Sequence, residues 1–316
     1  MRHAFQHTLN LSAFLLLALL GTSSQANYTT PAIALNDGQA PTIHYHAIGK
    51  PQAPLVIVLG GGPAFSSWNL EPIQQQIAQH GYLATLTDMQ GLGENPQTPP
   101  HILTGWVTQI NRLKTHLSPH QPAILVGHSW GALMAMLYTR EHPNAVAKLI
   151  LLNPVDPEKK SMQQLTDEIH HRNHQEQDQQ AFDTSEAMWD NRIPENIDLE
   201  AITLRQIHQV LPTYFYDYAL GLEYAQQFTA QDFDIDLNVN AWKEYDANPI
   251  QYAQIPKTLP KYFMDCTHDY LMPYNLNAMQ AHWAFKQTAV FERCGHFPWI
   301  EAPKAFNEAL QGFLEE

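Results

Sequence analysis

The segment Gly127–Gly131 (Gly-His-Ser-Trp-Gly) contains the best candidate for a nucleophile. It follows the apolar run Ala123–Val126 and precedes a helical pattern over Ala132–Glu141. A sharp turn between a strand and a helix lifts the Ser129 hydroxyl above the sheet, and the flanking glycines relieve crowding there. This context predicts that Ser129 attacks a carbonyl carbon in an acyl-transfer reaction.

A serine hydroxyl needs a base that takes its proton, and the base needs a carboxylate that orients it. His296 lies just past the last apolar strand pattern, Thr288–Phe291, and is the predicted base. The other late histidines fit less well. His282 falls within a helical pattern and is assigned to the surface, and His268 precedes the candidate acids and is assigned to a loop.

The acid is expected after the strand that precedes His296, in the chain order serine, acid, histidine. Asp269 lies in a loop beyond the strand pattern Lys261–Met264, four residues before a proline, whereas Asp265 is expected at the strand end itself. We therefore predict Asp269 as the acid, with Asp265 as the alternative.

Two backbone N–H groups are predicted to bind the negatively charged oxygen that develops during such a reaction. One belongs to Trp130, the residue after the serine. The other is assigned to Gly62 in the loop Gly60–Pro63, because glycines let the backbone approach a substrate closely. A phosphate-binding loop is the rival interpretation, and it fails because neither Gly-Lys-Ser/Thr nor G-x-G-x-x-G follows.

Short apolar runs alternate with helical patterns along most of the chain. The predicted strands are Thr42–Ile48, Leu55–Leu59, Leu83–Leu86, Ala123–Val126, Leu149–Leu152, Lys261–Met264 and Thr288–Phe291. The predicted helices among them are Leu103–Leu117, Ala132–Glu141, Asn275–Phe285 and Lys304–Leu314. This alternation is typical of an α/β protein with a mostly parallel sheet and helices on both faces.

The stretch 156–254 interrupts the alternation. It has no apolar β run of similar strength, and Leu199–Leu211 and Tyr214–Phe228 have helical patterns. We predict a helical cap inserted between two sheet strands, which leaves 27–155 and 255–316 as the core domain. A solvated helix face is favoured over a metal site for the histidine group in this stretch, because no carboxylate–histidine signature accompanies it; the group comprises His170, His171 and His174.

Residues 1–26 have the pattern of a secretory signal peptide. Arg2 precedes the apolar run Leu11–Leu20, and small and polar residues lead to the predicted cut after Ala26. An uncleaved membrane anchor is disfavoured, because the run is shorter than the roughly 20 residues that span a bilayer. We therefore expect an exported protein, periplasmic or secreted, without stable membrane insertion after cleavage.

The charge balance argues against one class of partner. Asp and Glu total 31 against 17 Lys and Arg, which gives a formal net charge of −14. Nucleic-acid binding needs a basic surface, so a small molecule or a short peptide is the expected partner. The hydrophobic fraction of 44% is enough for a sizeable buried core.

Four segments, Gly60–Ala64, Asp88–Gly93, Gly127–Gly131 and Gly295–Pro303, occur in this order along the chain. Together they resemble the α/β-hydrolase superfamily, and within it most closely the proline iminopeptidase (prolyl aminopeptidase) family. The resemblance covers roughly 33–155 and 255–313. It implies an α/β-hydrolase fold and a serine hydrolase, without a metal or other cofactor, that releases an N-terminal residue, typically proline, from short peptides.

The sequence departs from that family at positions that bear on substrate. Gly60 and Ala64 stand where the family has His and Gly, Gln90 and Asn95 stand where it has Arg and Ser, and Leu152 replaces a substrate-binding Arg. Family members bind the substrate's free amine with acidic cap residues, for which the candidates here are Glu195, Glu200, Glu223 and Glu244. A carboxylesterase for small esters and a non-catalytic binding protein are therefore kept as alternatives.

The chain has two cysteines, Cys266 and Cys294. Cys266 lies three residues before Asp269, and Cys294 lies two residues before His296. Because the two loops must converge for catalysis, the thiols are expected to be close together. A disulfide between them is one expectation in an oxidising compartment, and two buried free thiols are the other.

Overall fold

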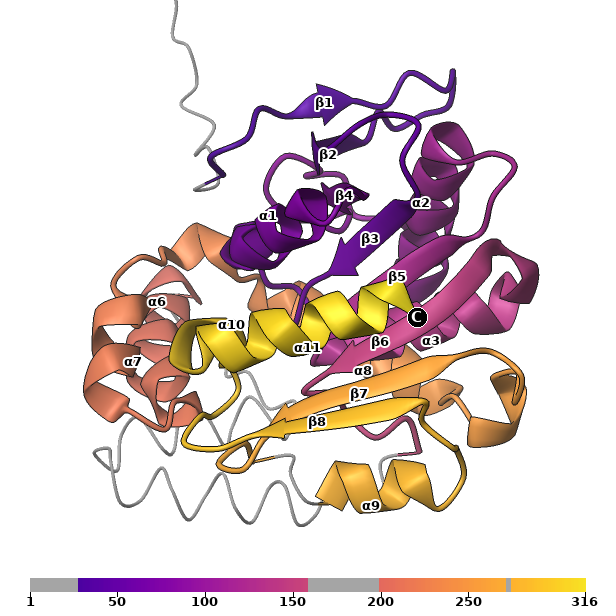
Figure 1. The fold of residues 1–316 in the computed structure, drawn as a ribbon. Coiled ribbons are helices and arrows are strands. Elements are labelled where there is room, and N and C mark those ends of the chain that lie inside the picture. Colours follow the sequence, from indigo (N-terminus) through magenta and orange to yellow (C-terminus); the bar gives the residue numbers. More distant parts are fainter. Residues whose placement is uncertain (1–27, 159–198, 271–273) are drawn as a thin grey trace, which may run out of the picture.

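A computed structural model describes residues 28–158, 199–270 and 274–316 (Figure 1). The predicted signal peptide and the group of His170, His171 and His174 lie outside the described residues. No helix in the described part of the chain is long and apolar enough to cross a lipid bilayer.

The described strands form one sheet in the order β1-β2-β4-β3-β5-β6-β7-β8. In chain order they are β1 Ile33–Ala34, β2 His44–Ile48, β3 Leu55–Leu59, β4 Leu83–Leu86, β5 Ala123–His128, β6 Val146–Leu152, β7 Lys261–Cys266 and β8 Gln287–Phe291. β2 pairs antiparallel with both β1 and β4, and the strands from β4 to β8 pair in parallel. The predicted α/β class with a mostly parallel sheet is therefore confirmed.

The helices of the described residues are α1 Glu71–Gln79, α2 Ile102–Leu117, α3 Trp130–Glu141, α6 Leu199–Val210, α7 Tyr218–Ala225, α8 Ile235–Ala247, α9 Tyr274–Gln280, α10 Pro298–Glu301 and α11 Pro303–Glu315. Within the stretch 156–254, the structure describes α6, α7 and α8 with short 3-10 turns between them. These elements lie between β6 and β7, as the inserted helical stretch was predicted to do.

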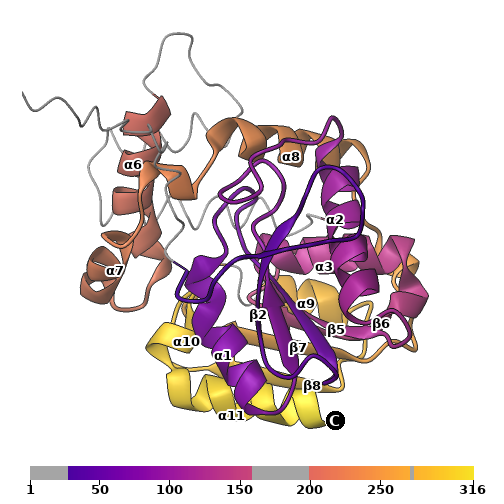
Figure 2. The ribbon, with the colours of Figure 1, turned by 90° about the horizontal axis from the view of Figure 1, so that it is seen from above.

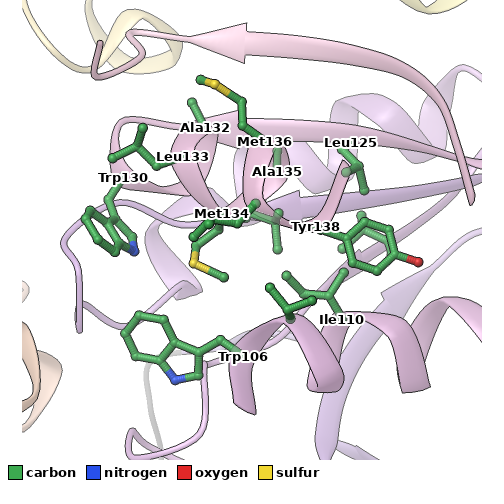
Figure 3. Close-up of a cluster of buried hydrophobic side chains, with 14 of the residues drawn as sticks. Trp106, Ile110, Leu125, Trp130, Ala132, Leu133, Met134, Ala135, Met136 and Tyr138 are labelled. Atoms are coloured by element: carbon green, nitrogen blue, oxygen red, sulfur yellow. The ribbon is translucent and has the colours of Figure 1, made fainter. Parts of the chain in front are cut away.

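The two faces of the sheet are covered by different helices (Figures 1 and 2). Along β3, Leu55, Ile57 and Leu59 join the apolar cluster beneath α2 and α3, whereas Val56 and Val58 join the cluster beneath α1 and α11. This is why the predicted strand is apolar throughout: successive side chains point to opposite faces, and both faces are buried. Figure 3 shows side chains of α3 packed toward Trp106 and Ile110 of α2.

Two predicted helices are shorter than their apolar patterns. The pattern over Tyr214–Phe228 is divided, because Phe215 is extended and Asp217 begins α7 by accepting the N–H of Leu220. The pattern over Asn275–Phe285 ends as a helix at Gln280. The buried Trp283 beyond it packs from a loop, where its indole N–H donates to a backbone carbonyl. Apolar spacing therefore found buried positions such as Trp283, but it did not locate the helix ends, and Tyr216 and Leu222 are exposed.

Candidate active site

Ser129 occupies a strained turn between β5 and α3. Its φ of 55° and ψ of −119° place a non-glycine residue in a backbone region that side chains rarely adopt. The backbone N–H of Ser129 donates to the Leu152 carbonyl at the end of β6, at 2.9 Å. The side chain is partly exposed although the strand before it is buried. The turn therefore presents the hydroxyl at the carboxyl edge of the sheet.

The glycines on either side of Ser129 are required by close backbone contacts. A Cβ on Gly127 would lie 2.5 Å from the Gly131 carbonyl oxygen, and a Cβ on Gly131 would lie 2.1 Å from the Leu59 carbonyl oxygen. Both distances are shorter than any real Cβ contact. The sequence pattern thus reflects a turn that only glycine permits at these two positions.

The glycine loop after β3 lies directly against Ser129. A Cβ on Gly61 would meet Ser129 Cβ at 3.3 Å and His128 Nδ1 at 3.2 Å. Gly62 has a φ of 125°, which favours glycine, and a Cβ there would lie 2.8 Å from the Ala64 nitrogen. Trp130 is the first residue of α3, and the N–H groups of a first helical turn have no partner within the helix. Trp130 adjoins the serine in the chain, and Gly62 adjoins Gly61, which lies against it.

The loop that contains Gly62 is bonded to the cap as well as to the core. The hydrogen bonds are Ser66 N–H to the Asp232 carbonyl (2.8 Å), Asp234 N–H to the Ala64 carbonyl (3.1 Å), Trp68 Nε1–H to Asp232 Oδ1 (2.8 Å) and Asn238 Nδ2–H to the Pro63 carbonyl (2.7 Å). The cap segment 232–238 thus holds the loop in place. Asn238 was not singled out in the sequence, because no local pattern marks a contact between residues so far apart along the chain.

His296 meets Asp269 in the structure. Its Nδ1 lies 2.7 Å from Asp269 Oδ2, and both side chains are buried. Asp269, and not Asp265, is thus the carboxylate in contact with the predicted base. The hydrogen bond fixes the proton on Nδ1 and leaves Nε2 as the nitrogen that can accept a proton.

His128 connects the Ser129 turn to the His296 loop. Its Nε2–H donates to the His296 carbonyl at 3.0 Å, and the two rings lie 4.6 Å apart between centroids. Burial holds the pKa of His128 well below its usual range, so this ring is neutral at neutral pH. His128 therefore ties the two loops together without adding a charge beside the candidate base.

The His296 loop is also held by the cap and by α10. The His296 N–H donates to the Tyr214 carbonyl at 2.7 Å. Glu301 accepts the N–H groups of Gly295, at 2.7 Å, and of Asp217 in the cap, at 2.9 Å. Sequence reasoning had not given Tyr214 or Glu301 this role. In the sequence, Glu301 is marked only by its place five residues after His296.

A buried amide lies behind the His296–Asp269 pair. Asn153, which directly follows β6, donates from Nδ2 to Asp269 Oδ2 at 2.5 Å and to Asp265 Oδ1 at 2.8 Å. Its φ of 44° is one that asparagine tolerates better than most residues. The signal that could have identified Asn153 is its type: a polar residue directly after the buried apolar run Leu149–Leu152 needs buried partners.

The structure joins Cys266 and Cys294 by a disulfide, with Cα atoms 5.3 Å apart. The bond links the end of β7 to the loop after β8. The backbone supports the same junction, since the His268 N–H donates to the Cys294 carbonyl. Both cysteines are fully buried. The loops that carry Asp269 and His296 are thereby fixed to each other close to the two side chains.

The acidic cap candidates have different surroundings. Glu244 accepts the N–H groups of Ile102 and Leu103 at the start of α2, each at 2.9 Å. Glu223 is exposed on α7, while Glu195 and the Glu200 side chain lie outside the described residues. Among the residues that are described, no group of three or more His, Cys, Asp or Glu side chains is arranged to hold a metal ion.

Comparison with known proteins places this geometry in a family. Residues 54–303 match the family described as alpha/beta hydrolase fold. The chain is 23% identical over 286 residues to the proline iminopeptidase of Lactobacillus helveticus, which covers 86% of this chain and 94% of that protein. It is 32% identical over 114 residues to human epoxide hydrolase 4, which covers 35% of this chain and 30% of that protein.

Solved structures show the same fold. A serine hydrolase from the polyaromatic-hydrocarbon-degrading bacterium Cycloclasticus zankles superposes with a TM-score of 0.65 at 20% identity, covering 90% of this chain and 97% of that one. The family match spans most of the chain and includes Ser129, Asp269 and His296. The sheet, the strand-to-helix turn at Ser129 and the family match agree. This chain therefore belongs to the alpha/beta hydrolase fold family.

Proposed function

We propose that this hydrolase is an exported serine aminopeptidase that releases an N-terminal residue, of the proline type, from short peptides. The observation that carries the proposal is the buried His296–Asp269 pair, 2.7 Å apart, held beside the strained turn of Ser129. This chain is similar to proline iminopeptidases over most of their length. Those relatives are named for this activity, which supports the choice of substrate.

The proposed reaction proceeds through an acyl-enzyme. Ser129 attacks the carbonyl carbon of the scissile bond while His296 takes the hydroxyl proton, and Asp269 stabilises the resulting imidazolium. The N–H groups of Gly62 and Trp130 bind the oxyanion. His296 then gives its proton to the leaving amine. In the second half, His296 takes a proton from water, and the hydroxide attacks the ester to release the N-terminal residue and restore Ser129.

A carboxylesterase for small esters is the second candidate, and one observation favours it. A free-amine specificity needs a carboxylate that faces the substrate, yet the Glu244 carboxylate is occupied by the first turn of α2. The same three residues would perform ester hydrolysis, with an alcohol as the leaving group. The two candidates therefore differ in substrate binding and not in the chemistry of Ser129.

Export is part of the proposal, and the contacts of the residues that follow the predicted cut are compatible with removal of residues 1–26. Glu71 accepts the backbone N–H and hydroxyl of both Thr29 and Thr30, and Tyr28 donates its hydroxyl to Asp88 at 2.8 Å. Residues that follow the predicted cut at Ala26 are thus bonded to the core from Tyr28 onward. Mass spectrometry of protein recovered from outside the cytoplasm is expected to show a chain that starts at Asn27.

The test compares the mature protein with Ser129→Ala on three substrates: a proline aryl-amide with a free amine, its N-blocked analogue, and a short-chain aryl ester. We expect turnover of the free-amine amide, none of the blocked amide, and loss of at least about 10³-fold in kcat in the variant. Cleavage of the ester alone would replace the aminopeptidase with the esterase. Absence of Ser129-dependent labelling by a fluorophosphonate probe would favour a non-catalytic binding protein instead.

A further inference from the structure

A second carboxyl group lies behind the candidate triad. Asp265, near the end of β7, is fully buried. Its Oδ1 accepts the Asn153 amide N–H and the Cys266 backbone N–H, each at 2.8 Å. Its Oδ2 is buried and accepts no hydrogen bond. A buried ionised carboxylate requires its oxygens to be satisfied, so this arrangement does not suit a charged Asp265.

Asp265 and Asp269 share one amide donor, because both accept from Asn153 Nδ2. Two carboxyl groups this close in a buried site do not both ionise, and one keeps a proton. Asp269 contacts His296 Nδ1, whose positive form stabilises a negative charge, so Asp269 is the ionised member. Burial and then the Asp269 carboxylate raise the pKa of Asp265 well above its usual range.

We propose that Asp265 is a positioning residue that keeps its proton at neutral pH and, together with Asn153, holds the ionised Asp269 carboxylate against His296. The proton turns the orphaned Oδ2 from an acceptor into a donor. We assign the Asp269 carboxylate as its acceptor, because Asp269 and Asp265 accept from the same Asn153 amide. This inference rests on the proposed serine mechanism and deepens it, since it adds a proton-bearing group to the three residues already assigned.

The groups that face the pair from other elements are consistent with a single negative charge. His296 approaches from the loop after β8, and the neutral His128 approaches from the end of β5. Tyr214 approaches from the cap, where burial first and then the Asp269 charge raise its pKa, so it too is neutral. Among the groups named here, His296 is the one that can carry a positive charge next to the Asp269 carboxylate.

The sharpest test is Asp265→Asn, which keeps a side-chain donor and cannot ionise. The acid limb of the pH profile of kcat/KM reports deprotonation of the catalytic base in the free enzyme. If Asp265 is already neutral, the substitution changes no charge, and we expect the midpoint of this limb to stay within about 0.3 pH unit. If Asp265 is ionised, removal of its charge destabilises the imidazolium, and the midpoint falls by about one pH unit or more. That fall would overturn the proposal.

The matched variant Asp265→Val removes the donor and retains a side chain of similar size. We expect kcat to fall about tenfold or more with KM within about twofold, because a hydrogen bond to a charged group is lost. Asp265→Asn is expected to recover most of this loss. Wild-type kcat in Asp265→Val would show that Asp265 does not position Asp269 and would refute the proposal.

Two controls keep the result interpretable. If Asp265→Val does not fold, judged by thermal melting, the midpoint of the acid limb in Asp265→Asn decides the question.

Isotope-edited infrared spectra give a readout that needs no activity. We expect a protonated carboxyl band at pH 7 in the wild type and no such band in Asp265→Asn. Identical spectra would refute the proposal. Failure of fluorophosphonate to label wild-type Ser129 refutes the serine mechanism, whereas normal labelling with a shifted midpoint refutes only the role of Asp265.

Discussion

At the scale of single residues, surroundings decide what a side chain does. Glu244 belongs to the inserted stretch that would carry an amine anchor. Its two oxygens instead accept the first two N–H groups of α2, whose preceding residue, His101, supplies no side-chain cap. Glu244 of α8 therefore caps the N-terminus of α2, a role that a neighbouring residue in the chain usually has.

We expect Glu244→Ala to lower the free energy of unfolding by about 1 kcal/mol, as loss of a helix cap does, and to leave the rate ratio between free-amine and blocked substrates unchanged. Urea unfolding and the paired amide assays measure the two effects. The control is Lys243→Ala, which removes an exposed charged side chain next to Glu244 on α8 and should change neither. A collapse of the ratio in Glu244→Ala without loss of stability would identify Glu244 as the amine anchor after all.

At the scale of elements, the cap and the core share the loop 60–68. The cap segment 232–238 forms backbone and side-chain hydrogen bonds with it, including the bond of Asn238 Nδ2 to the Pro63 carbonyl. Pro63 adjoins the predicted oxyanion donor Gly62. A cap held in this way influences catalysis even where it does not contact the substrate, because oxyanion donors act through preorganised positions.

Asn238→Ala is therefore predicted to lower kcat by about tenfold, a fraction of what loss of an oxyanion donor costs, with a smaller change in KM. Steady-state kinetics on the best substrate measures both constants. Asn240→Ala is the matched control, since Asn240 is exposed on the same helix two residues further on. Equal kinetics for the two variants would show that the loop keeps its position without the Asn238 bond.

At the scale of the whole molecule, the two ends of the parallel strands differ: the candidate catalytic residues follow the carboxyl ends, and a buried lysine lies at the amino end of β7. Ser129, Asn153 and Asp269 follow the carboxyl ends of their strands, whereas Lys261 begins β7 at the opposite end. Lys261 is 1% exposed, and its Nζ donates to the carbonyls of Pro256 and Leu259. Burial lowers its pKa to about 8.

This buried lysine makes stability depend on pH in a stated direction. Between about pH 8 and pH 10.4 the unfolded chain binds a proton that the folded chain has released. Stability therefore rises as pH increases through this window, relative to a variant without the amine. Urea unfolding at pH 7 and pH 9 should show the rise in the wild type and not in Lys261→Met. Parallel pH dependence in the two proteins would mean that Lys261 keeps its proton in the folded state.

Much of the fold could be predicted from local patterns in the sequence. The runs Leu55–Leu59 and Leu83–Leu86 coincide with β3 and β4, because a strand buried on both faces is almost entirely apolar. The one polar residue of β4, Thr85, donates its hydroxyl to the Val56 carbonyl. α2 and α3 begin one or two residues before their predicted starts. The helices α1 and α8 were not predicted. Both carry many polar residues among their apolar ones, and neither was recognised as a helix.

The sequence by itself determined the residues that nearby chemistry constrains: the glycines around Ser129, the apolar strands, and the types of residue that follow the strand ends. Their identity is imposed by contacts a few residues away, such as the approach of Gly127 to Gly131. The position of Asp269 in a loop beyond the strand also led to it as the acid, and His296 contacts it. Only the tertiary structure decided that Asn153 joins two acids and that Glu244 caps α2. These partners come from strands and helices that packing brings together. Contacts between residues far apart in the chain produce no regular spacing that could be recognised in the sequence.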